Sequence, residues 1–529
     1  MFETILRNPD CVMVESAAAA RNGAGGCFSH NGVRVETEFR GETLDVYITS
    51  DTQPVSRVRL RWLFEERLRG QVLGDAWERA YGDLEWTCVN PFRSLPWYAL
   101  VNDGADTAGY GVRVRPGAIC SWQLDPEGIT LWLDARSGGE GVMLNGRRLL
   151  AARLVSQVYS GASAFDAARD FCWRMCVDPL LPPKPVYGSN NWYYAYGHSD
   201  AQTILAEADY MARLTRGLPN RPYVVIDDGW QQGRYTANGA FDEVYNGGPW
   251  LPNARFGDMG ALASQIARKG AIPGLWVRLL QDDSAAIPAA WRLASGALDP
   301  SRPEVLAHVR QIVDRIGRWG FKLLKHDFST YDITGLWGWQ MPHEMTVDGW
   351  HFADRTRTTA EIIVDFYRAI LEAARPHDML VLGCNAVGHL GAGLMHLNRI
   401  GEDTSGLVWE RTLKHGVNAL AYRMPQHRAF FDADADCIGI TEHIDWALNR
   451  QWGELLSRSG TSMFVSVAPN SLTEEQEEAL RRMLAANARP REAACPLDWQ
   501  ETTLPRLWRI DGETAQFNWH GARGQRTAF

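Results

Sequence analysis

Hydrophobic and polar residues alternate in short segments over the first third of the chain. Examples are VRVETEF, TLDVYITS, VSRVRLRWLF and ITLWLDAR. Side chains two positions apart on a strand share a face, so this alternation predicts strands with one buried face. Asn-Gly and Asp-Gly pairs, which are typical of antiparallel hairpins, separate the segments. We therefore expect an antiparallel β-sandwich over residues 1–176.

The pattern changes after the segment VDPLLPPKPVYG, which contains four prolines and is typical of a linker. Eight apolar segments follow it, and most of them precede an amphipathic stretch of helical period. This alternation predicts a (β/α)8 barrel over residues 177–488. Alternation of period two returns in residues 489–529 and predicts a short C-terminal β region. The fold class expected is a multidomain α/β protein.

Polar residues follow several of the predicted barrel strands at the point where each strand ends. In such barrels the active site lies at the carboxyl ends of the strands, so these side chains are expected to converge on one rim. The groups concerned are Asp227-Asp228-Gly229-Trp230, Lys325-His326-Asp327, Cys384-Asn385 and Glu402-Asp403.

The segment GFKLLKHDFS shows how one of these strand ends is expected to work. On a strand, Lys325 and Asp327 share a face, whereas His326 points to the opposite side, toward the surrounding helices. A lysine beside an aspartate favours the ionised carboxylate. We therefore expect Asp327 to be charged and directed at the barrel mouth, and His326 to be structural.

Composition and charge restrict the partners and the location. The net charge is −9 and the chain has no basic run, which argues against a nucleic-acid partner. No apolar stretch reaches the roughly 18 residues of a membrane span, and the first residues do not resemble a signal peptide. Nine scattered cysteines indicate reduced thiols and a cytoplasmic location. A homo-oligomer stays an open alternative.

Several reaction classes lack their motifs. The sequence contains no G-x-S-x-G, no H-E-x-x-H and no Walker-type segment. The run DADADC, from Asp432 to Cys437, resembles a calcium loop but has cysteine at position six and His443 at position twelve. We expect Asp432, Asp434 and Asp436 to form a hydrogen-bonded acidic turn, with metal binding as the alternative, and we expect no cofactor.

Convergent carboxylates and 22 tryptophans favour glycoside hydrolysis, because indole faces suit sugar rings. That reaction needs an ionised nucleophile and a protonated acid. Asp327 fits the first role. Asp403 fits the second, since it shares a face with Arg399 if the strand stays extended, whereas Glu402 would point away. The adjacent Asp227 and Asp228 suit the hydroxyls of one sugar.

The segments VVIDDGWQ, LLKHDFS, GCN and RIGEDTS, in this order, resemble the α-galactosidases of glycoside hydrolase family 36, of the compact bacterial type. The resemblance covers residues 180–470. It implies a retaining double displacement on α-galactosides through a covalent glycosyl-enzyme, with Asp327 as nucleophile and Asp403 as acid/base. The substrate-binding residues that it and the adjoining positions imply are Asp227, Asp228, Lys325, Arg399, Cys384, Trp192, Tyr193, Trp276, Trp230 and Asn385.

Arg278 departs from the family pattern. It stands two residues after Trp276 of the third strand, where many relatives have glutamate. We expect Arg278 to pair with an acid of the rim, with binding of a charged substrate as the alternative. Four other functions stay open: an α-N-acetylgalactosaminidase, a raffinose-synthase-like galactosyl transferase, a non-catalytic sugar-binding protein, and a metal-dependent barrel hydrolase that uses Asp227, Asp228 and the acidic run. Cys384 favours an unsubstituted sugar 2-hydroxyl. Retention requires carboxyl groups about 5 to 6 Å apart at Asp327 and Asp403.

Overall fold

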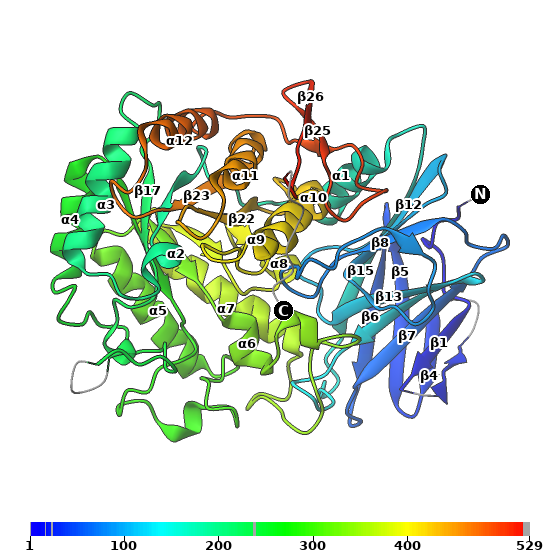
Figure 1. Cartoon of the computed structure of the whole chain (residues 1–529). Helices are drawn as coiled ribbons and strands as arrows, with labels where there is room; N and C mark the ends of the chain where they lie inside the picture. Colours follow the sequence, from blue (N-terminus) through cyan, green and yellow to red (C-terminus); the bar gives the residue numbers. More distant parts are fainter. Residues whose placement is uncertain (1, 16, 23–24, 236–239, 522–529) are drawn as a thin grey trace.

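The computed structural model describes all residues except 1, 16, 23–24, 236–239 and 522–529. It consists of an N-terminal β-sandwich, a closed barrel of parallel strands surrounded by helices, and a small C-terminal sheet. Figure 1 shows the sandwich and the barrel side by side, with the C-terminal strands above the contact between them. The predicted fold class is confirmed.

The sandwich contains two antiparallel sheets. Strand β7 shows the predicted alternation, because Val58, Leu60 and Trp62 are buried while the arginines between them point outward. The six-stranded sheet has the order β10-β13-β14-β7-β1-β2, with β1 (Cys11–Val14), β2 (Ala17–Ala18), β7 (Arg57–Leu63), β10 (Leu95–Pro96), β13 (Ile119–Asp125) and β14 (Gly128–Asp134). The nine-stranded sheet has the order β3-β4-β5-β6-β15-β12-β11-β8-β9, with β3 (Ala20–Arg21), β4 (Cys27–His30), β5 (Val33–Arg40), β6 (Thr43–Ser50), β8 (Gln71–Gly74), β9 (Thr87–Cys88), β11 (Tyr98–Asn102), β12 (Asp106–Val112) and β15 (Leu149–Ser160).

The barrel closes with eight parallel strands, each at the position that the apolar segments predict. Most of their residues are buried on both faces, as expected for strands enclosed by helices. The strands are β16 (Tyr187–Asn190), β17 (Tyr223–Ile226), β18 (Ile272–Val277), β19 (Leu323–His326), β20 (Leu380–Gly383), β21 (Leu397–Arg399), β22 (Asp432–Gly439) and β23 (Ser462–Ser466).

Amphipathic helices cover the outside of the barrel. The helix before β20 begins with a capping box, in which Thr358 accepts from the Glu361 N–H and Glu361 accepts from the Thr358 N–H. The long helices are α3 (Ala201–Leu214), α4 (Met259–Lys269), α5 (Pro303–Arg318), α7 (Thr359–Ala374), α11 (Trp446–Arg458) and α12 (Glu474–Asn487). Shorter ones are α2 (Trp192–Ala195), α6 (Ser329–Thr334), α8 (Gly388–Gly391), α9 (Trp409–Arg411) and α10 (Ala419–Arg423), while α1 (Ala164–Met175) precedes the linker.

The acidic run at Asp432 corrects one expectation. It is not a turn: Asp432, Asp434 and Asp436 lie in β22, fully buried, with a register shift between Asp434 and Cys437. Arg399 of the neighbouring strand binds Asp434 and Asp436 at 3.2 and 2.8 Å. Within the described residues, no group of three or more His, Cys, Asp or Glu side chains is arranged to hold a metal ion.

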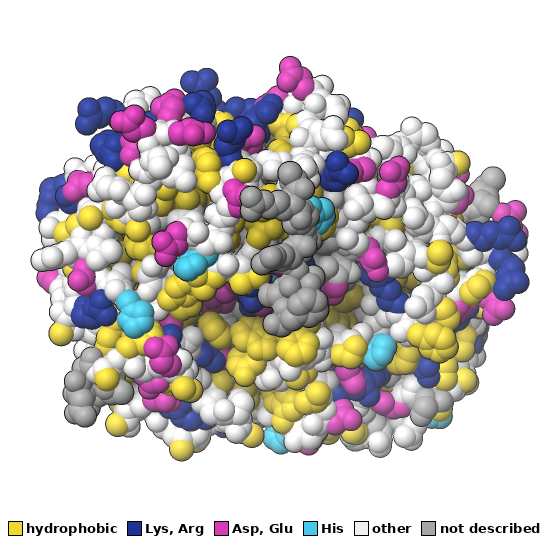
Figure 2. Space-filling model, viewed as in Figure 1, with side chains coloured by type: hydrophobic (Ala, Val, Ile, Leu, Met, Phe, Trp, Pro, Cys, Tyr) yellow, Lys and Arg dark blue, Asp and Glu magenta, His cyan; other side chains and the backbone are white. Residues whose placement is uncertain are grey.

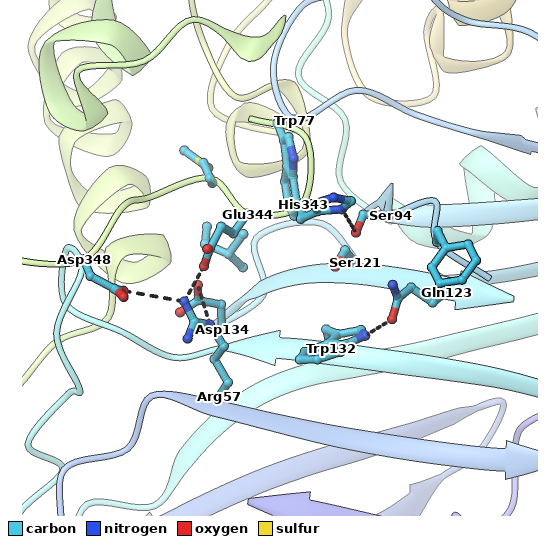
Figure 3. A pocket seen from close by; sticks show the side chains of 13 residues that line it. Arg57, Trp77, Ser94, Ser121, Gln123, Trp132, Asp134, His343, Glu344 and Asp348 are labelled. Carbon is cyan, nitrogen blue, oxygen red and sulfur yellow. Dashed lines mark hydrogen bonds and ion pairs between the residues drawn. The ribbon is translucent and has the colours of Figure 1, made fainter. Parts of the chain in front are cut away.

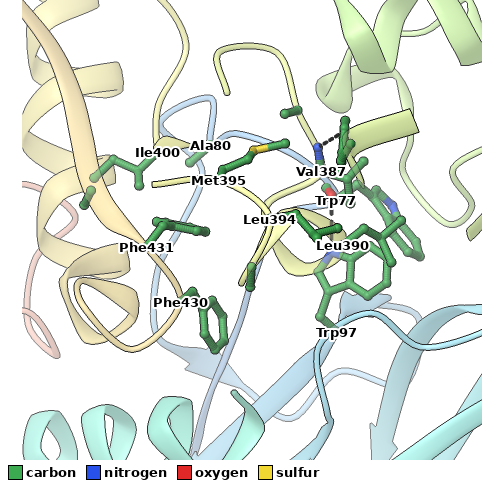
Figure 4. Close-up of a cluster of buried hydrophobic side chains, with 14 of the residues drawn as sticks. Trp77, Ala80, Trp97, Val387, Leu390, Leu394, Met395, Ile400, Phe430 and Phe431 are labelled. Atoms are coloured by element: carbon green, nitrogen blue, oxygen red, sulfur yellow. Dashed lines mark hydrogen bonds between the residues drawn. The ribbon is translucent and has the colours of Figure 1, made fainter. Parts of the chain in front are cut away.

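A loop of the sandwich, residues 75–86, packs against the barrel. It follows β8, and its Ala80 pairs with Gly401 in an isolated parallel bridge just beyond the end of β21. Below the bridge, side chains of both domains form one apolar cluster, in which Trp77 and Trp97 meet Leu390, Leu394 and Phe430 (Figure 4). The domains therefore share a core at this point, and the loop is fixed over the barrel rim.

The C-terminal sheet contains β24 (Cys495–Pro496), β25 (Leu507–Ile510) and β26 (Glu513–Gln516). Trp499, just after β24, contacts Trp86 of the sandwich loop edge to face, and its carbonyl accepts from Tyr422 of α10 at 2.6 Å. This sheet therefore closes the junction between the other two domains. The predicted short β region is confirmed.

The surface carries both signs of charge. Acidic and basic side chains are interspersed on the face that Figure 2 shows, especially over the helices of the barrel. In the described part of the chain, no helix is long and apolar enough to cross a membrane. All nine cysteines are free, and Cys11 and Cys88 are exposed.

Candidate active site

A pocket of about 160 Å³ lies at the carboxyl ends of the barrel strands. A cavity of about 150 Å³ binds benzene, so this volume is on the scale of one six-membered ring. Most of the predicted site residues line it. The lining residues are Asn190, Trp192, Tyr193, Asp227, Asp228, Arg234, Glu243, Val244, Asn246, Trp276, Lys325, Asp327, Phe328, Asp403 and Asp436.

Asp327 follows β19 and is held by N–H donors on both of its oxygens. Its Oδ1 accepts from the backbone N–H groups of Phe328 at 2.7 Å and Asn385 at 3.0 Å. Its Oδ2 accepts from the Trp276 indole at 3.1 Å. Phe328 has a φ of 58°, so the chain turns sharply into α6 directly after the carboxylate. These contacts fix the carboxylate at the pocket wall.

Asp327 is an ionised carboxylate. Burial by itself would raise its pKa, but the charges of Arg79 and Lys325 and the hydrogen bonds from Trp276 and Phe328 outweigh burial and lower the pKa to about 2. The ion pair of Lys325 is nevertheless with Asp227, at 2.7 Å. Lys325 therefore acts on Asp327 through space, and Arg79 is the stronger of the two charges.

Asp403 has the opposite electrostatic environment. Burial and the neighbouring Glu402 carboxylate raise its pKa to about 6, although Arg79 and Arg399 lower it in part. The Arg399 guanidinium donates to Asp403 Oδ1 at 3.2 Å, although β21 ends at Arg399 and the two residues do not share a strand face. The Asp403 side chain retains an exposed fraction of 38% and lines the pocket. It can therefore hold a proton and deliver it there.

Arg79 comes from the sandwich and was not identified from the sequence. Its guanidinium lies 3.1 Å from Glu402 Oε2 and 3.8 Å from Asp403 Oδ1, and it stands over the Trp337 ring. Glu402 does not line the pocket, and its carboxylate binds Arg79 of the sandwich loop. The segment AWERAYG contains both Glu78 and Arg79. Nothing in their spacing indicates that either residue belongs to a site on the barrel.

Glu78, next to Arg79, is fully buried and braces the loop behind Asp327. Its carboxylate accepts from the Asn385 amide, the Tyr81 hydroxyl and the Gly338 N–H. Burial raises the pKa of Glu78, opposed in part by the charge of Arg79. Asn385 donates its backbone N–H to Asp327, so Glu78 positions one of the groups that hold Asp327.

Two adjacent aspartates line the pocket just after β17. Asp227 accepts from Lys325 and, at 2.6 Å, from the Asn190 amide. Asp228 accepts from Gln231 at 2.7 Å and lies 3.3 Å from Arg234. Burial raises the pKa of Asp228 to about 7 against the charge of Arg234. These paired carboxylates can accept from two neighbouring hydroxyls of one ligand.

The chain turns after Asp228 at a glycine whose backbone requires the absence of a side chain. Gly229 has a φ of 113°, and a Cβ there would lie 2.4 Å from the Gly197 carbonyl oxygen. This turn directs Trp230 away from the pocket. Its indole donates to the Trp276 carbonyl at 2.8 Å, and the side chain is fully buried beside Trp250. The expectation that Trp230 contacts the substrate is thereby corrected.

Aromatic side chains complete the lining. Trp276, Trp192 and Phe328 border the pocket together with Tyr193. The Tyr193 hydroxyl donates to Asp436, which Arg399 also binds. Asp436 lines the pocket as well, and it was considered from the sequence only as a member of the acidic run.

Three further predicted residues lie behind the pocket wall and act through neighbours. Arg399 positions Asp403, and Asn385 donates to Asp327. Cys384 is fully buried, and its Sγ lies 3.9 Å from an Arg79 nitrogen. The sequence predicts direct contact between these three residues and the substrate. In the structure they support the groups that line the pocket instead.

Arg278 forms the ion pair that its sequence position predicts. Its guanidinium binds both oxygens of Asp332 in α6, at 2.5 to 3.0 Å, and donates to Asn246. It also stacks on the Phe328 ring at 4.3 Å. His326 faces α7, as expected: it contacts the Tyr367 ring, and burial lowers its pKa to about 4, so it is neutral.

The comparisons with known proteins identify the fold. No protein-family model matches the chain, and no curated protein sequence matches it. TtGalA, an α-galactosidase from Thermus thermophilus solved with p-nitrophenyl α-D-galactopyranoside, is 17% identical with a TM-score of 0.61, over 94% of this chain and 98% of that one. The GH36 α-galactosidase AgaA from Geobacillus stearothermophilus is 13% identical with a TM-score of 0.61, over 94% and 79%. A variant of AgaA, solved with raffinose, is 12% identical with a TM-score of 0.60 over the same shares.

Proposed function

We propose that this protein is a retaining exo-α-galactosidase. The observation that carries the proposal is the pair Asp327 and Asp403, which line one pocket with pKa values moved in opposite directions. One carboxyl group is then ionised and the other protonated between about pH 2 and pH 6. A retaining glycosidase requires this combination of nucleophile and acid.

In the first step, a carboxylate oxygen of Asp327 forms a bond to the anomeric carbon. The bond from that carbon to the glycosidic oxygen breaks, and Asp403 transfers its proton to the departing oxygen. The aglycone leaves as an alcohol, and the sugar stays on Asp327 as an ester. The N–H donors of Trp276, Phe328 and Asn385 hold Asp327 for this attack.

In the second step, the Asp403 carboxylate accepts a proton from water. The water oxygen bonds to the anomeric carbon, and the ester bond breaks, which restores the Asp327 carboxylate. Two inversions at the anomeric carbon amount to retention. Arg79 and Arg399 stabilise Asp403 in the anionic form that the second step needs.

The size and polarity of the pocket support action on one terminal sugar. About 160 Å³ admits a single ring, and Asp227 and Asp228 together present acceptors for two adjacent hydroxyls. Structures of similar fold were solved with a galactoside and with raffinose, which favours galactose over other hexoses. The free thiols support a cytoplasmic location as part of the same proposal.

The test is hydrolysis of the p-nitrophenyl α-glycosides of galactose, N-acetylgalactosamine and glucose by the wild type and by Asp327→Ala. We expect cleavage of the galactoside alone, with α-galactose as the first product by NMR and a loss of more than 10³-fold in the variant. Cleavage of the acetamido sugar would identify the other reaction of this fold. β-Galactose as the first product would contradict retention. No cleavage of any glycoside would favour a binding protein.

A further inference from the structure

A second cavity, of about 500 Å³, lies on the outer face of the six-stranded sheet. Strands β13 and β14 form its floor, and the segment Glu344–Asp348, between β19 and α7, borders it from the barrel side (Figure 3). We call it the sheet cavity. It is about three times as large as the catalytic pocket, and the proposed reaction does not use it.

Trp132 is the aromatic centre of the floor. The strand register places Arg59, Trp132 and Ser121 side by side on three neighbouring strands. The Arg59 guanidinium stacks on the indole at 4.6 Å and does not line the cavity, so the remainder of the ring faces the cavity. The indole nitrogen donates to Gln123 at 2.6 Å. The ring is therefore a partly exposed platform held in one orientation.

Hydrogen-bonding groups surround this platform, and two of them have no protein partner among the described residues. Within the described part of the chain, the Ser121 hydroxyl and the Gln123 amide nitrogen bond to no other protein group, and both side chains line the cavity. Ser94 and His343 form a single contact at 3.4 Å on the same rim. Phe92 adds an aromatic side chain with an exposed fraction of 82%.

The charged groups of the sheet cavity are already paired with one another. Arg57 binds Glu344, and the buried Arg136 binds Asp134, Glu344 and Asp348 at 2.5 to 2.9 Å. Each of these charges already has a partner of opposite sign, so none of them is left unpaired to attract a charged ligand. The site therefore suits a neutral ligand with apolar faces and a hydroxyl edge.

We propose that the sheet cavity binds a neutral oligosaccharide of at least two rings. One ring stacks on Trp132, and its hydroxyls bond to Gln123 and Ser121, the arrangement in which aromatic floors and planar amides recognise sugars. The chemistry of the site, rather than the proposed reaction, carries this inference. Trp77 lines the cavity and directly precedes Glu78 and Arg79, so the two sites adjoin the same loop.

The experiment uses ¹⁹F NMR of the full chain labelled with 5-fluorotryptophan and carrying Asp327→Ala to prevent turnover. Trp132→Phe assigns the Trp132 signal. Stachyose and maltotetraose are the probes, and Trp276 reports the catalytic pocket. We expect the Trp132 signal to shift saturably with either sugar, while Trp173, an exposed tryptophan of α1, stays unchanged. With stachyose, a shift at Trp132 without one at Trp276 would support the sheet cavity and contradict the proposed galactosidase, whereas maltotetraose is expected to shift Trp132 alone.

Gln123→Ala should weaken the binding reported by Trp132 about two- to tenfold, since it removes one hydrogen bond to the ligand. Gln202→Ala, on the exposed side of α3, is the matched control and should leave that affinity unchanged. A Trp132 signal that neither sugar moves would overturn the proposal. A Trp132 signal that moves with protein concentration, and not with sugar concentration, would also overturn the proposal. The cavity would then be a contact between copies of the chain.

Discussion

Arg79 Nη1 lies 3.8 Å from Asp403 Oδ1, although the two residues belong to different domains. The loop that carries Arg79 pairs with the barrel chain beyond β21, where the Ala80 N–H donates to the Ile400 carbonyl at 2.9 Å. Arg79 also contributes the largest favourable charge to Asp327. The sandwich therefore contributes to the electrostatics of the pocket in addition to its structural role.

Replacing Arg79 by alanine should move the pH profile of kcat/KM to higher pH. Arg79 lowers the pKa of both Asp327 and Asp403, so its removal raises both. Activity needs Asp327 ionised, which sets the acid limb near pH 2, and Asp403 protonated, which sets the basic limb near pH 6. Each limb should therefore move to higher pH by about 1 to 3 units. Initial rates from pH 3 to 9 measure the shift of the basic limb, because the wild-type acid limb lies below this range.

Arg79→Lys is the control, because it retains the positive charge but loses the planar contact with Glu402. We expect its limbs to stay close to those of the wild type. A profile for Arg79→Ala that falls in height without moving along the pH axis would assign Arg79 a purely structural role.

Ala80→Pro should disconnect the loop from the barrel. Proline lacks the N–H that Ala80 donates to Ile400, so the bridge beside Gly401 would lose a bond and Arg79 its fixed position. We expect a fall in kcat of about tenfold or more with a pH profile displaced as in Arg79→Ala. Ala80→Gly, which retains the N–H and adds no group to this fully buried position, should stay close to the wild type, and equal losses in both variants would argue against the bridge.

Asp403→Ala should lose activity according to the leaving group. p-Nitrophenolate needs little protonation, so the formation of the glycosyl-enzyme should persist and appear as a burst of nitrophenol. Natural galactosides should be cleaved about 10²- to 10⁴-fold more slowly. Azide, which needs no general base, should restore turnover and yield α-galactosyl azide. A β-azide product, or equal losses on both substrates, would show that Asp403 is not the acid/base.

Arg278→Ala should destabilise the fold more than it changes sugar preference. It leaves Asp332, almost fully buried, without its bidentate partner, and breaking such a pair costs about 3 to 5 kcal/mol. The free energy of unfolding in urea measures this loss. The double variant Arg278→Ala with Asp332→Ala should recover a large part of it, and full stability in Arg278→Ala alone would show that the pair contributes little.

Much of the fold and part of the site follow from local patterns. Alternation of period two predicts the sandwich strands, and apolar segments with polar ends predict the eight barrel strands. The rule that parallel strands end on one rim is sufficient to bring Asp227, Asp327 and Asp403 to a common pocket. The sequence also predicts that Arg278 pairs with a carboxylate, because acidic residues follow the neighbouring strands.

Only the tertiary structure decided which groups surround those carboxylates. Arg79 and Glu402 are 323 residues apart, and no periodicity connects them. Glu402 follows a strand that ends at Arg399, after which the chain pairs with Ala80, so strand alternation no longer fixes its direction. Trp230 leaves the pocket because the backbone turns at Gly229. Sequence periodicity determines elements and the ends of strands. Contacts between distant segments depend on how the domains pack, and these contacts set the pKa values on which the proposed reaction depends.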